Sequence, residues 1–280
     1  FLGSLNPKFL NSRHKGLRRM LNTQSRPVWV DISPENLRHN ARVIRALCPD
    51  SQLMAVIKAD GYGHGMLDVA KALENADSFG VNSVDDVKRL HAAGIYKPCN
   101  LFAPHITPQT LAFCAEHQCR PTIYDHSHFD LLDALGASES SKTLDVWLKV
   151  DTGMGRLGFA PEEINAALER LKSCKSVQGI HLMSHLASAD DINNGLNRNQ
   201  LEKFAQFDSL SDINSRSLLN SAGIVGFPQG AYDWIRPGLL LYGVSPSAHI
   251  NTRALGLKPV MNFNSRVISV KTINAGHGIG

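Results

Sequence analysis

The sequence lacks the features that would place it among membrane-spanning or disulfide-stabilised proteins. No apolar run approaches the length of about 20 residues that a transmembrane helix needs. The five cysteines are odd in number and none forms a Cys-x-x-Cys pair, which argues against a disulfide framework and against a zinc site. We therefore expect reduced thiols, a cytoplasmic location, no bound metal and no membrane partner.

Acidic residues are absent from the first 30 positions, which carry six lysines and arginines. When this +6 is taken from the net charge of +4, the remaining 250 residues carry −2. The body of the protein therefore gives no reason to expect a nucleic-acid partner. The basic arm leaves three interpretations open: a transit-like peptide, a tail that touches nucleic acid or anionic lipid, or a disordered or non-native segment of residues 1–25. We expect the last of these.

Short apolar runs alternate with segments of helical periodicity, a pattern typical of βαβ units and a parallel sheet. With 280 residues and 43% hydrophobic content, the chain is long enough to bury one large core. Helices are expected to begin after the capping residues Ser33, Ser83 and Thr107. The predicted strands are Leu53–Lys58, Ser78–Val81, Asn100–Ala103, Thr122–Asp125, Leu144–Val150, Val177–Met183, Ser217–Asn220 and Tyr232–Arg236.

Eight such units over about 200 residues suit a TIM (β/α)8 barrel, although a doubly wound open sheet would show the same alternation. A further strand-like run, Val28–Ile32, precedes the eight and falls outside that count. We expect this run, along with Val267–Val270, to pair with the second domain outside the barrel.

Lys58 closes the first apolar run and opens the glycine-rich segment AVIKADGYGHG, which starts at Ala55. A buried amine favours its neutral, nucleophilic form, which is what bond formation with an aldehyde cofactor requires. The glycines that follow let the backbone approach a ligand closely, and Tyr62 adds a hydroxyl. On the strand pattern alone, Lys58 could instead cover apolar surface with its stem while its amine reaches water.

The segment Arg236-Pro237-Gly238-Leu239 predicts a phosphate site after the last strand. Pro237 suits the first position of a helix and Gly238 leaves its N–H unobstructed, so free amides at a helix N-terminus can hold an anion. Ser221 would add a hydroxyl from the preceding strand, and TIM barrels often bind phosphate after strands seven and eight. Ordinary turn chemistry is the alternative for each residue taken alone.

Five segments in this order resemble alanine racemases, fold-type III enzymes that use pyridoxal 5′-phosphate (PLP). They are AVIKADGYGHG from Ala55, LKVDTGMGRLGF from Leu148, HLMSHLASAD from His181, LLNSAG from Leu219 and WIRPGLLLYG from Trp234. The resemblance implies an α/β chain with a PLP-binding TIM barrel and leading strand at 26–256, followed by the start of a mostly β domain at 257–280. Family members usually begin near Arg26, so residues 1–19 are expected to be non-native.

Site residues follow from the resemblance, position by position. Catalytic roles are implied for Lys58, Arg156, His185 and Arg236. Cofactor contacts are implied for Lys58, Tyr62, Asn220, Ser221, Arg236, Gly238 and Leu239. Substrate contacts are implied for Arg156 and Met154, and Lys149 lies where the family often carries a carboxylated lysine. His181, inside a predicted strand, is expected to be a structural core residue.

For Arg236 and Lys149, the sequence also allows an interpretation in which neither residue has a role in a functional site. In the family the arginine faces the pyridine nitrogen, where its permanent charge disfavours protonation of the ring, a feature of racemases rather than decarboxylases. Taken without the motif, Arg236 is compatible with a surface arginine, and Lys149 with Arg156 is compatible with a strand-end pair of charged residues.

The resemblance implies a homodimeric alanine racemase that interconverts L-alanine and D-alanine for peptidoglycan. Lys58 would serve the D-alanine face as one acid–base group. The second would be a tyrosine of the partner subunit that falls just after Gly280, so this chain is expected to be a fragment with little or no racemase activity. Alternatives are a racemase of broader or different specificity, such as serine, and a non-catalytic PLP-binding barrel.

Overall fold

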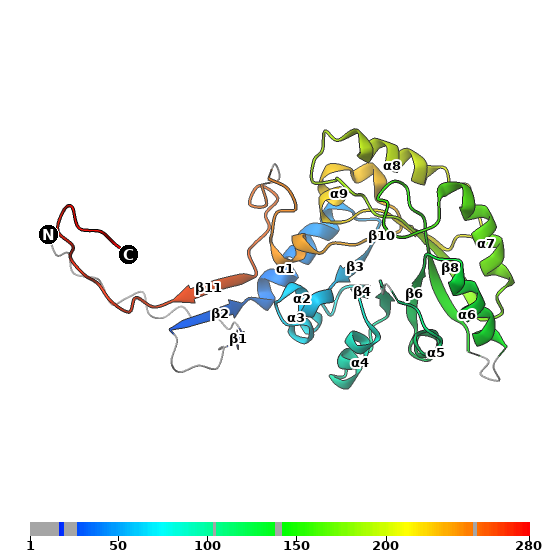
Figure 1. The fold of residues 1–280 in the computed structure, drawn as a ribbon, viewed down its shortest axis with the longest axis horizontal. Helices are drawn as coiled ribbons and strands as arrows, with labels where there is room; N and C mark the ends of the chain where they lie inside the picture. Colours follow the sequence, from blue (N-terminus) through cyan, green and yellow to red (C-terminus); the bar gives the residue numbers. More distant parts are fainter. Residues whose placement is uncertain (1–16, 20–26, 103–104, 138–141, 249–250) are drawn as a thin grey trace.

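Eight parallel strands close into a barrel in the order β10-β3-β4-β5-β6-β7-β8-β9 (Figure 1). The computed structural model describes residues 17–19, 27–102, 105–137, 142–248 and 251–280. The barrel strands are β3 Gln52–Val56, β4 Ser78–Val81, β5 Cys99–Leu101, β6 Cys119–Ile123, β7 Leu144–Lys149, β8 Val177–Met183, β9 Ser215–Ser217 and β10 Trp234–Ile235. This closed barrel confirms the predicted fold class and excludes the open sheet.

Each predicted strand is present, but several end earlier than expected. β3 ends at Val56, so Lys58 lies beyond the strand rather than closing it. β9 covers Ser215–Ser217 instead of Ser217–Asn220, because Asn220 caps a helix and cannot continue the strand. β10 is reduced to two residues, Trp234–Ile235. The short strands bring the polar residues that follow them onto the rim of the barrel.

Helices cover the outside of the barrel and begin at the predicted caps. Ser33, Ser83 and Thr107 each accept a hydrogen bond from the backbone N–H three residues later. The helices are α1 Pro34–Leu47, α2 Lys58–Tyr62, α3 Met66–Ala72, α4 Val84–Ala92, α5 Pro108–His117, α6 Ser127–Gly136, α7 Ile164–Ser173, α8 Gly195–Ala205 and α9 Ser221–Gly226. Short 3-10 helices lie at η2 Pro161–Glu163, η3 Pro228–Gly230 and η4 Leu239–Tyr242.

A separate three-stranded antiparallel sheet projects from one side of the barrel (Figure 1). Its central strand, β2 Val28–Ile32, pairs with β1 Leu17–Arg19 and with β11 Met261–Ser265. The prediction that Val28–Ile32 pairs outside the barrel is confirmed, and one of its two partners, Met261–Ser265, lies in the expected second domain. The segment Val267–Val270, by contrast, forms no strand, and all four of its residues are exposed, so no packing stabilises a strand there.

The described part of the basic arm also differs from expectation. Leu17–Arg19 forms β1 against β2, so disorder does not hold for these three residues. The remainder of the arm, 1–16 and 20–25, lies outside the described residues.

Large side chains fill the interior of the barrel below its rim. Met54, Trp147, Met183 and Trp234 are buried together in a cluster that also contacts Phe102. The Trp147 indole Nε1 donates to the Asn100 side-chain oxygen at 2.6 Å, which satisfies the polar edge of the ring inside the barrel. Because the lower interior is packed with side chains, a ligand can enter only at the carboxyl ends of the strands.

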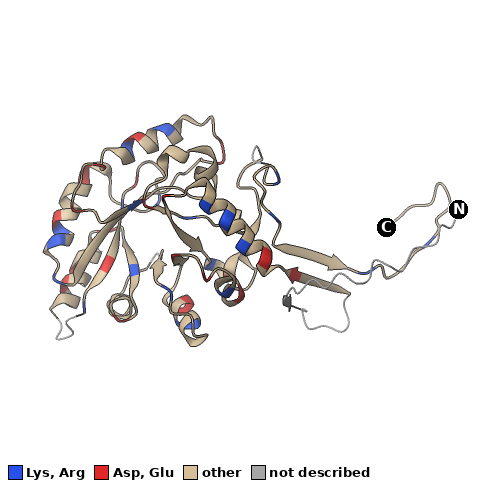
Figure 2. Ribbon diagram, turned by 180° about the vertical axis from the view of Figure 1, so that it is seen from behind, with Lys and Arg blue, Asp and Glu red and all other residues tan. Residues whose placement is uncertain are grey.

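Two features are absent from the described residues. No helix among them is long and apolar enough to span a bilayer, and no group of three or more metal-ligating side chains forms within that part of the chain. All five cysteines are buried and free, as expected for thiols without a disulfide framework. On the outer helices basic and acidic residues lie side by side, as Figure 2 shows.

Candidate active site

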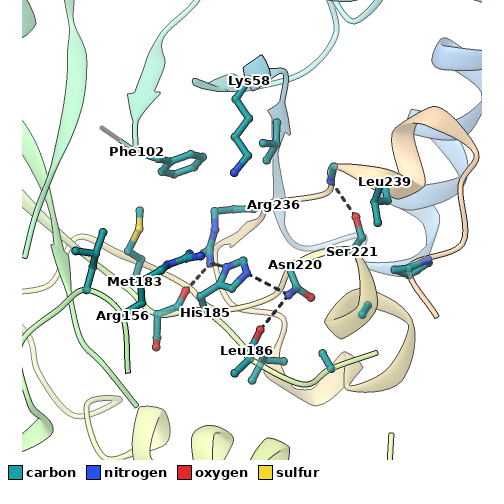
Figure 3. A pocket seen from close by; sticks show the side chains of 18 of the residues that line it. Lys58, Phe102, Arg156, Met183, His185, Leu186, Asn220, Ser221, Arg236 and Leu239 are labelled. Carbon is teal, nitrogen blue, oxygen red and sulfur yellow. Dashed lines mark hydrogen bonds between the residues drawn. The ribbon is translucent and has the colours of Figure 1, made fainter. Parts of the chain in front are cut away.

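A cavity of about 630 Å³ opens at the carboxyl ends of the barrel strands. Every site residue predicted from the sequence lines it except Met154. These residues are Lys58, Tyr62, Lys149, Arg156, His185, Asn220, Ser221, Arg236, Gly238 and Leu239. Figure 3 shows Lys58 entering from one side, with Arg236, His185 and Asn220 facing it from another.

Lys58 begins a turn with left-handed backbone. Ala59, Asp60, Gly61 and Tyr62 have φ values of 53°, 53°, 64° and 53°. The left-handed helical conformation costs an L-residue roughly 1–2 kcal/mol and usually occurs at single positions. A run of such residues therefore marks strain stored at this site, and the turn brings both Lys58 and Tyr62 to the cavity wall.

Contacts from three sides hold this turn. The Gly61 N–H donates to the Ile57 carbonyl at 2.8 Å, and Asp60 Oδ1 accepts from the Met66 N–H and from Arg89, both at 3.1 Å. His64 packs its ring against Tyr242 with centroids 4.4 Å apart. These contacts stabilise a backbone that the local sequence alone disfavours.

Burial and a neighbouring cation both act on the Lys58 amine. Partial burial is the larger cause that lowers the pKa of Lys58, and the nearby positive charge of Arg156 lowers it further. A lowered pKa increases the neutral fraction of the amine, the form that attacks a carbonyl carbon or accepts a proton. Lys58 therefore has the electrostatic setting that the sequence interpretation required.

Lys149, the last residue of β7, is 8% exposed and shares the cavity with two arginines. Burial, followed by repulsion from Arg236 and Arg156, lowers the pKa of Lys149 to about 8, against a weaker opposing effect of Asp151. At neutral pH a large fraction of the Lys149 amine is still protonated. Its positive charge then lies near the positive charges of the two arginines. Like charges thus act on Lys149 more strongly than the opposite charge of Asp151, so Lys149 does not form an ordinary ion pair.

Arg236 follows β10 and is held from below by the barrel. Its guanidinium is 6% exposed and donates to the Ser217 hydroxyl and to the carbonyls of Ser184 and Leu218. Burial lowers the pKa of Arg236 to about 10, which leaves it protonated at neutral pH. The surface-arginine alternative is therefore wrong.

His185 lies between Arg236 and Asn220. Its Nδ1 is 3.5 Å from the Arg236 guanidinium, and its Nε2 is 3.4 Å from the Asn220 side-chain nitrogen (Figure 3). Burial, then the charges of Arg236, Lys149, Arg156 and Lys58, lower the pKa of His185 to about 3. The ring is neutral at physiological pH. His181, by contrast, is buried within β8 and bonds to Ser215 at 2.6 Å, as expected for a structural residue.

The residues of the predicted phosphate cradle come together where α9 and η4 begin. Ser221 is the first residue of α9, and its hydroxyl accepts from the N–H groups of Gly238 at 2.9 Å and Leu240 at 3.3 Å. A β-carbon at Gly238 would lie 2.5 Å from the Tyr62 hydroxyl, so only glycine allows this approach. Tyr62, Ser221 and Gly238 thus converge.

Two details of the cradle differ from the sequence interpretation. Gly238 is the N-cap of η4, so Pro237 precedes the helix rather than starting it. The Gly238 N–H is also engaged, because Ser221 accepts from it. The polar groups expected to hold a phosphate hold one another in this structure.

Arg156 and Met154 lie in the loop after β7. The Asp151 carboxylate organises this loop by accepting from the N–H groups of Gly153, Met154 and Gly155 at 2.8–3.1 Å. Met154 therefore has its backbone donor satisfied and is not part of the cavity wall. Arg156 is exposed and, within the described chain, makes no hydrogen bond or ion pair, so its guanidinium is available to an anion.

Sequence reasoning missed several residues of the cavity wall. Asn82, Phe102 and Tyr124 each follow a barrel strand, and Thr122 lies near the end of β6. The rule that selected the other residues, their place at the carboxyl end of a strand, also applies to these four. They were overlooked because they belong to no recognised motif.

Comparisons with known proteins agree along most of the chain. Residues 32–246 match the family model described as alanine racemase, N-terminal domain. An alanine racemase of Nitrosococcus oceani is 40% identical over 250 residues, which cover 89% of this chain and 69% of that protein. A biosynthetic alanine racemase of Salmonella typhimurium is 40% identical over 253 residues, 90% of this chain and 69% of that protein.

Solved structures show the same similarity. The biosynthetic alanine racemase from Pseudomonas aeruginosa superposes with a TM-score of 0.83 at 33% identity, covering 91% of this chain and 70% of that one. The alanine racemase from Acinetobacter baumannii superposes with a TM-score of 0.84 at 31% identity, covering 91% and 71%.

Proposed function

The chain belongs to the alanine racemase family, and we propose that it interconverts L-alanine and D-alanine with PLP bound covalently at Lys58. The observation that carries this proposal is one arrangement of side chains. A lysine of lowered pKa faces a buried arginine and a neutral histidine across one cavity, and a hydroxyl-lined cradle closes one side of it.

The residues present fit an anionic aldehyde such as PLP. The cavity wall contains Lys58, Lys149, Arg156 and Arg236 but, among the described residues that line it, Asp190 is the one carboxylate. Excess positive charge in a partly enclosed site favours a phosphate-bearing ligand. Tyr62, Ser221, Gly238 and Leu239 would hold the phosphate, since hydroxyls and backbone N–H groups converge there.

Bound PLP would supply an electron sink that makes the Cα proton of alanine acidic enough to remove. The protein must then move protons on both faces of that carbon. We propose that the Lys58 amine accepts and returns the proton on the D-alanine face, since its lowered pKa favours the neutral form. The resemblance assigns the opposite face to a tyrosine from a partner subunit.

Arg236 is proposed to face the pyridine nitrogen. Three protein acceptors and burial fix its guanidinium with its charge retained. A fixed cation there disfavours protonation of the ring, which limits the electron sink and suits reversible proton transfer. His185 supports this arrangement as a neutral acceptor beside Arg236.

Arg156 and Met154 are proposed to contact substrate, and Arg156 is the better placed of the two. Its unpaired guanidinium lines the cavity and matches the carboxylate of alanine. Lys149 is proposed to be carboxylated on its amine, which would replace a repelled cation with an anion between two arginines.

The cellular role follows from the family. We propose that the protein works as a homodimer in the cytoplasm and provides D-alanine for peptidoglycan, with no nucleic-acid or membrane partner. Five free, buried thiols are compatible with a reducing compartment. The relatives share 69–71% of their length with this chain.

Covalent trapping tests the lysine assignment directly. The protein is incubated with PLP, reduced with borohydride and digested, and mass spectrometry then locates the modified lysine. We expect the label on Lys58, its loss in Lys58→Ala, and its retention in the control Lys142→Ala, which changes an exposed lysine. A cofactor absorbance band that survives Lys58→Ala would refute the assignment.

Activity is tested by a reaction that needs one base only. In D2O, nuclear magnetic resonance follows exchange of the Cα hydrogen of D-alanine, and we expect PLP-dependent exchange that Lys58→Ala lowers by at least 1000-fold. The same exchange measurement with D-serine in place of D-alanine separates an alanine racemase from a racemase of broader specificity. Labelling of Lys58 without any Cα exchange would favour a non-catalytic PLP-binding barrel.

A further inference from the structure

Gln200 lies in the middle of α8, on the outside of the barrel (Figure 1), and is fully buried at 0% exposure. No residue of α8 lines the cavity. A buried amide without hydrogen-bond partners would cost about 1–3 kcal/mol, so its contacts must be accounted for. All of its hydrogen bonds are made to loops that contribute residues to the cavity wall.

The Gln200 side chain makes hydrogen bonds to two different loops. Its oxygen accepts from the Ala187 N–H at 2.8 Å, and its Nε2 donates to the His185 carbonyl at 2.9 Å. The same Nε2 donates to the Thr152 hydroxyl at 3.1 Å. One acceptor and two donor hydrogens of a single amide are therefore used.

The two loops carry different parts of the proposed site. The segment 184–191, which follows β8 and is called the histidine loop here, contains His185. The segment 150–158, which follows β7 and is called the arginine loop here, contains Arg156. Gln200 joins them through His185 and Thr152, which lie in different loops.

A second set of contacts ties the same loops to Arg236. The hydroxyls of Thr152 and Ser184, both buried, are 2.8 Å apart. The Ser184 carbonyl accepts from the Arg236 guanidinium. Hydrogen bonds thus connect Gln200 through Thr152 and then Ser184, by its hydroxyl and its carbonyl, to Arg236 in the cavity wall.

Packing of α8 fits this attachment. A β-carbon at Gly153 would lie 3.2 Å from Leu196 and 3.6 Å from Gln200, so the arginine loop rests closely on the helix. Asn197, one turn before Gln200 and 1% exposed, donates to the carbonyls of Ser188 and Asp191. One face of α8 therefore holds both loops.

We propose that Gln200 is a positioning residue that holds the histidine loop and the arginine loop in one fixed arrangement around the cavity. The proposal rests on the proposed function where it concerns catalysis. Proton transfer is sensitive to displacements of about 1 Å in the groups around the reacting carbon. Loosening both loops displaces His185 and Arg156 together.

Two substitutions of similar size separate the contributions of the amide. Gln200→Met keeps the volume but removes all three hydrogen bonds. Gln200→Glu keeps an acceptor for Ala187, but its carboxylate faces the His185 carbonyl oxygen without a hydrogen between them. When protonated, the glutamic acid regains an O–H donor for that carbonyl, so it mimics glutamine only at low pH. The control is Gln206→Met, at the exposed C-cap of the same helix.

Hydrogen exchange on the cofactor-free protein is the first measurement. We expect Gln200→Met to lower the protection of the Ala187 amide at least tenfold and to speed exchange in both loops, with helices on the far side of the barrel unchanged. Gln206→Met should match the wild type. Unchanged protection in either loop would overturn the proposal, whatever the protein catalyses.

The second measurement is the rate of Cα exchange of PLP-loaded protein from pH 6 to pH 9. We expect Gln200→Met to lower the maximal rate about tenfold or more with less than a threefold change in KM. The deficit of Gln200→Glu should shrink as the pH falls, whereas that of Gln200→Met stays constant. Parallel pH profiles for the two variants would contradict a positioning role. If Gln200→Met does not fold, Thr152→Val tests the same link from its other end, and unchanged protection in the arginine loop would then reject the proposal.

Discussion

Lys58, Lys149, Arg156 and Arg236 share one cavity, where burial first and repulsion between like charges second act on the two lysines. The lysines respond by a lowered pKa, because an amine can release its proton. Arg236 keeps its charge, because a guanidinium remains protonated at neutral pH even when burial lowers its pKa to about 10. The difference between an amine and a guanidinium therefore supports the roles proposed for Lys58 as proton acceptor and for Arg236 as fixed cation.

Lys149 is predicted to react with carbon dioxide. With a pKa of about 8, about half of its amine is neutral at pH 8, and addition of CO2 forms a carbamate and releases a proton. The ammonium form of Lys149 is repelled by Arg236 and Arg156, whereas the carbamate anion would be attracted to both. In 13C-bicarbonate at pH 8 we expect one protein-bound carbamate resonance that weakens below pH 7 as the amine becomes protonated.

Two variants identify the source of this resonance. Lys149→Arg should abolish it, and Lys142→Arg, at an exposed position, should leave it unchanged. A resonance that persists in Lys149→Arg would rule out carboxylation at this position.

At the scale of the element, the left-handed turn of α2 is where local sequence and structure disagree. Its non-glycine residues Ala59, Asp60 and Tyr62 lie at φ 53°, and contacts from Asp60 and His64 maintain them there. The strain places Lys58 and Tyr62 on the cavity wall together, which a right-handed helix starting at Lys58 would not guarantee. Strain at a site of this kind is compatible with preorganisation for a ligand.

Ala59→Gly is predicted to stabilise the protein or leave its stability unchanged. Glycine adopts positive φ without steric cost, and Ala59 is exposed, so no packing is lost. The matched change Ala166→Gly, at an exposed position of α7, should instead destabilise by about 1 kcal/mol. Urea unfolding compares the two, and equal destabilisation would show that the turn at Ala59 carries no strain.

Individual elements also show how far sequence reasoning reaches. Ser33, Ser83 and Thr107 were predicted as caps because the signal is local, and each makes the expected bond. Strand ends were less accurate: Asn220 was assigned to a strand but caps α9, and Lys58 was assigned to β3 but lies in α2. Such boundaries depend on tertiary contacts, which periodicity does not report.

At the scale of the whole molecule, several histidines share a direction of pKa change. Burial lowers the pKa of His64, His91, His128 and His185, the last to about 3. In the unfolded chain each titrates near pH 6.5, so the unfolded state binds more protons than the native state below that pH. The stability that depends on these neutral histidines is therefore fully present above pH 6.5. It is lost as the pH falls toward their lowered pKa values in the folded state.

The expected result is a urea midpoint that decreases from pH 7 to pH 4.5. His185→Gln should flatten this decrease, because it removes the histidine whose pKa is lowered most. His277→Gln, at an exposed position near the end of the chain, is the control and should not. A midpoint that stays constant or rises on acidification would contradict the proposed burial of neutral histidines.

The sequence alone determined the class of fold and the family, and it selected ten of the residues that line the cavity. Hydrophobic periodicity repeats over the whole chain, and the motifs that contain Lys58, His185 and Arg236 are local in sequence. The periodicity and the motifs can therefore be recognised without a three-dimensional structure. Only the tertiary structure decided that Leu17–Arg19 and Met261–Ser265 flank β2, that Met154 does not line the cavity, and that Gln200 of an outer helix bonds to both the histidine loop and the arginine loop. These contacts join residues far apart in the chain, and whether a distant donor meets its acceptor depends on packing geometry rather than on any local pattern.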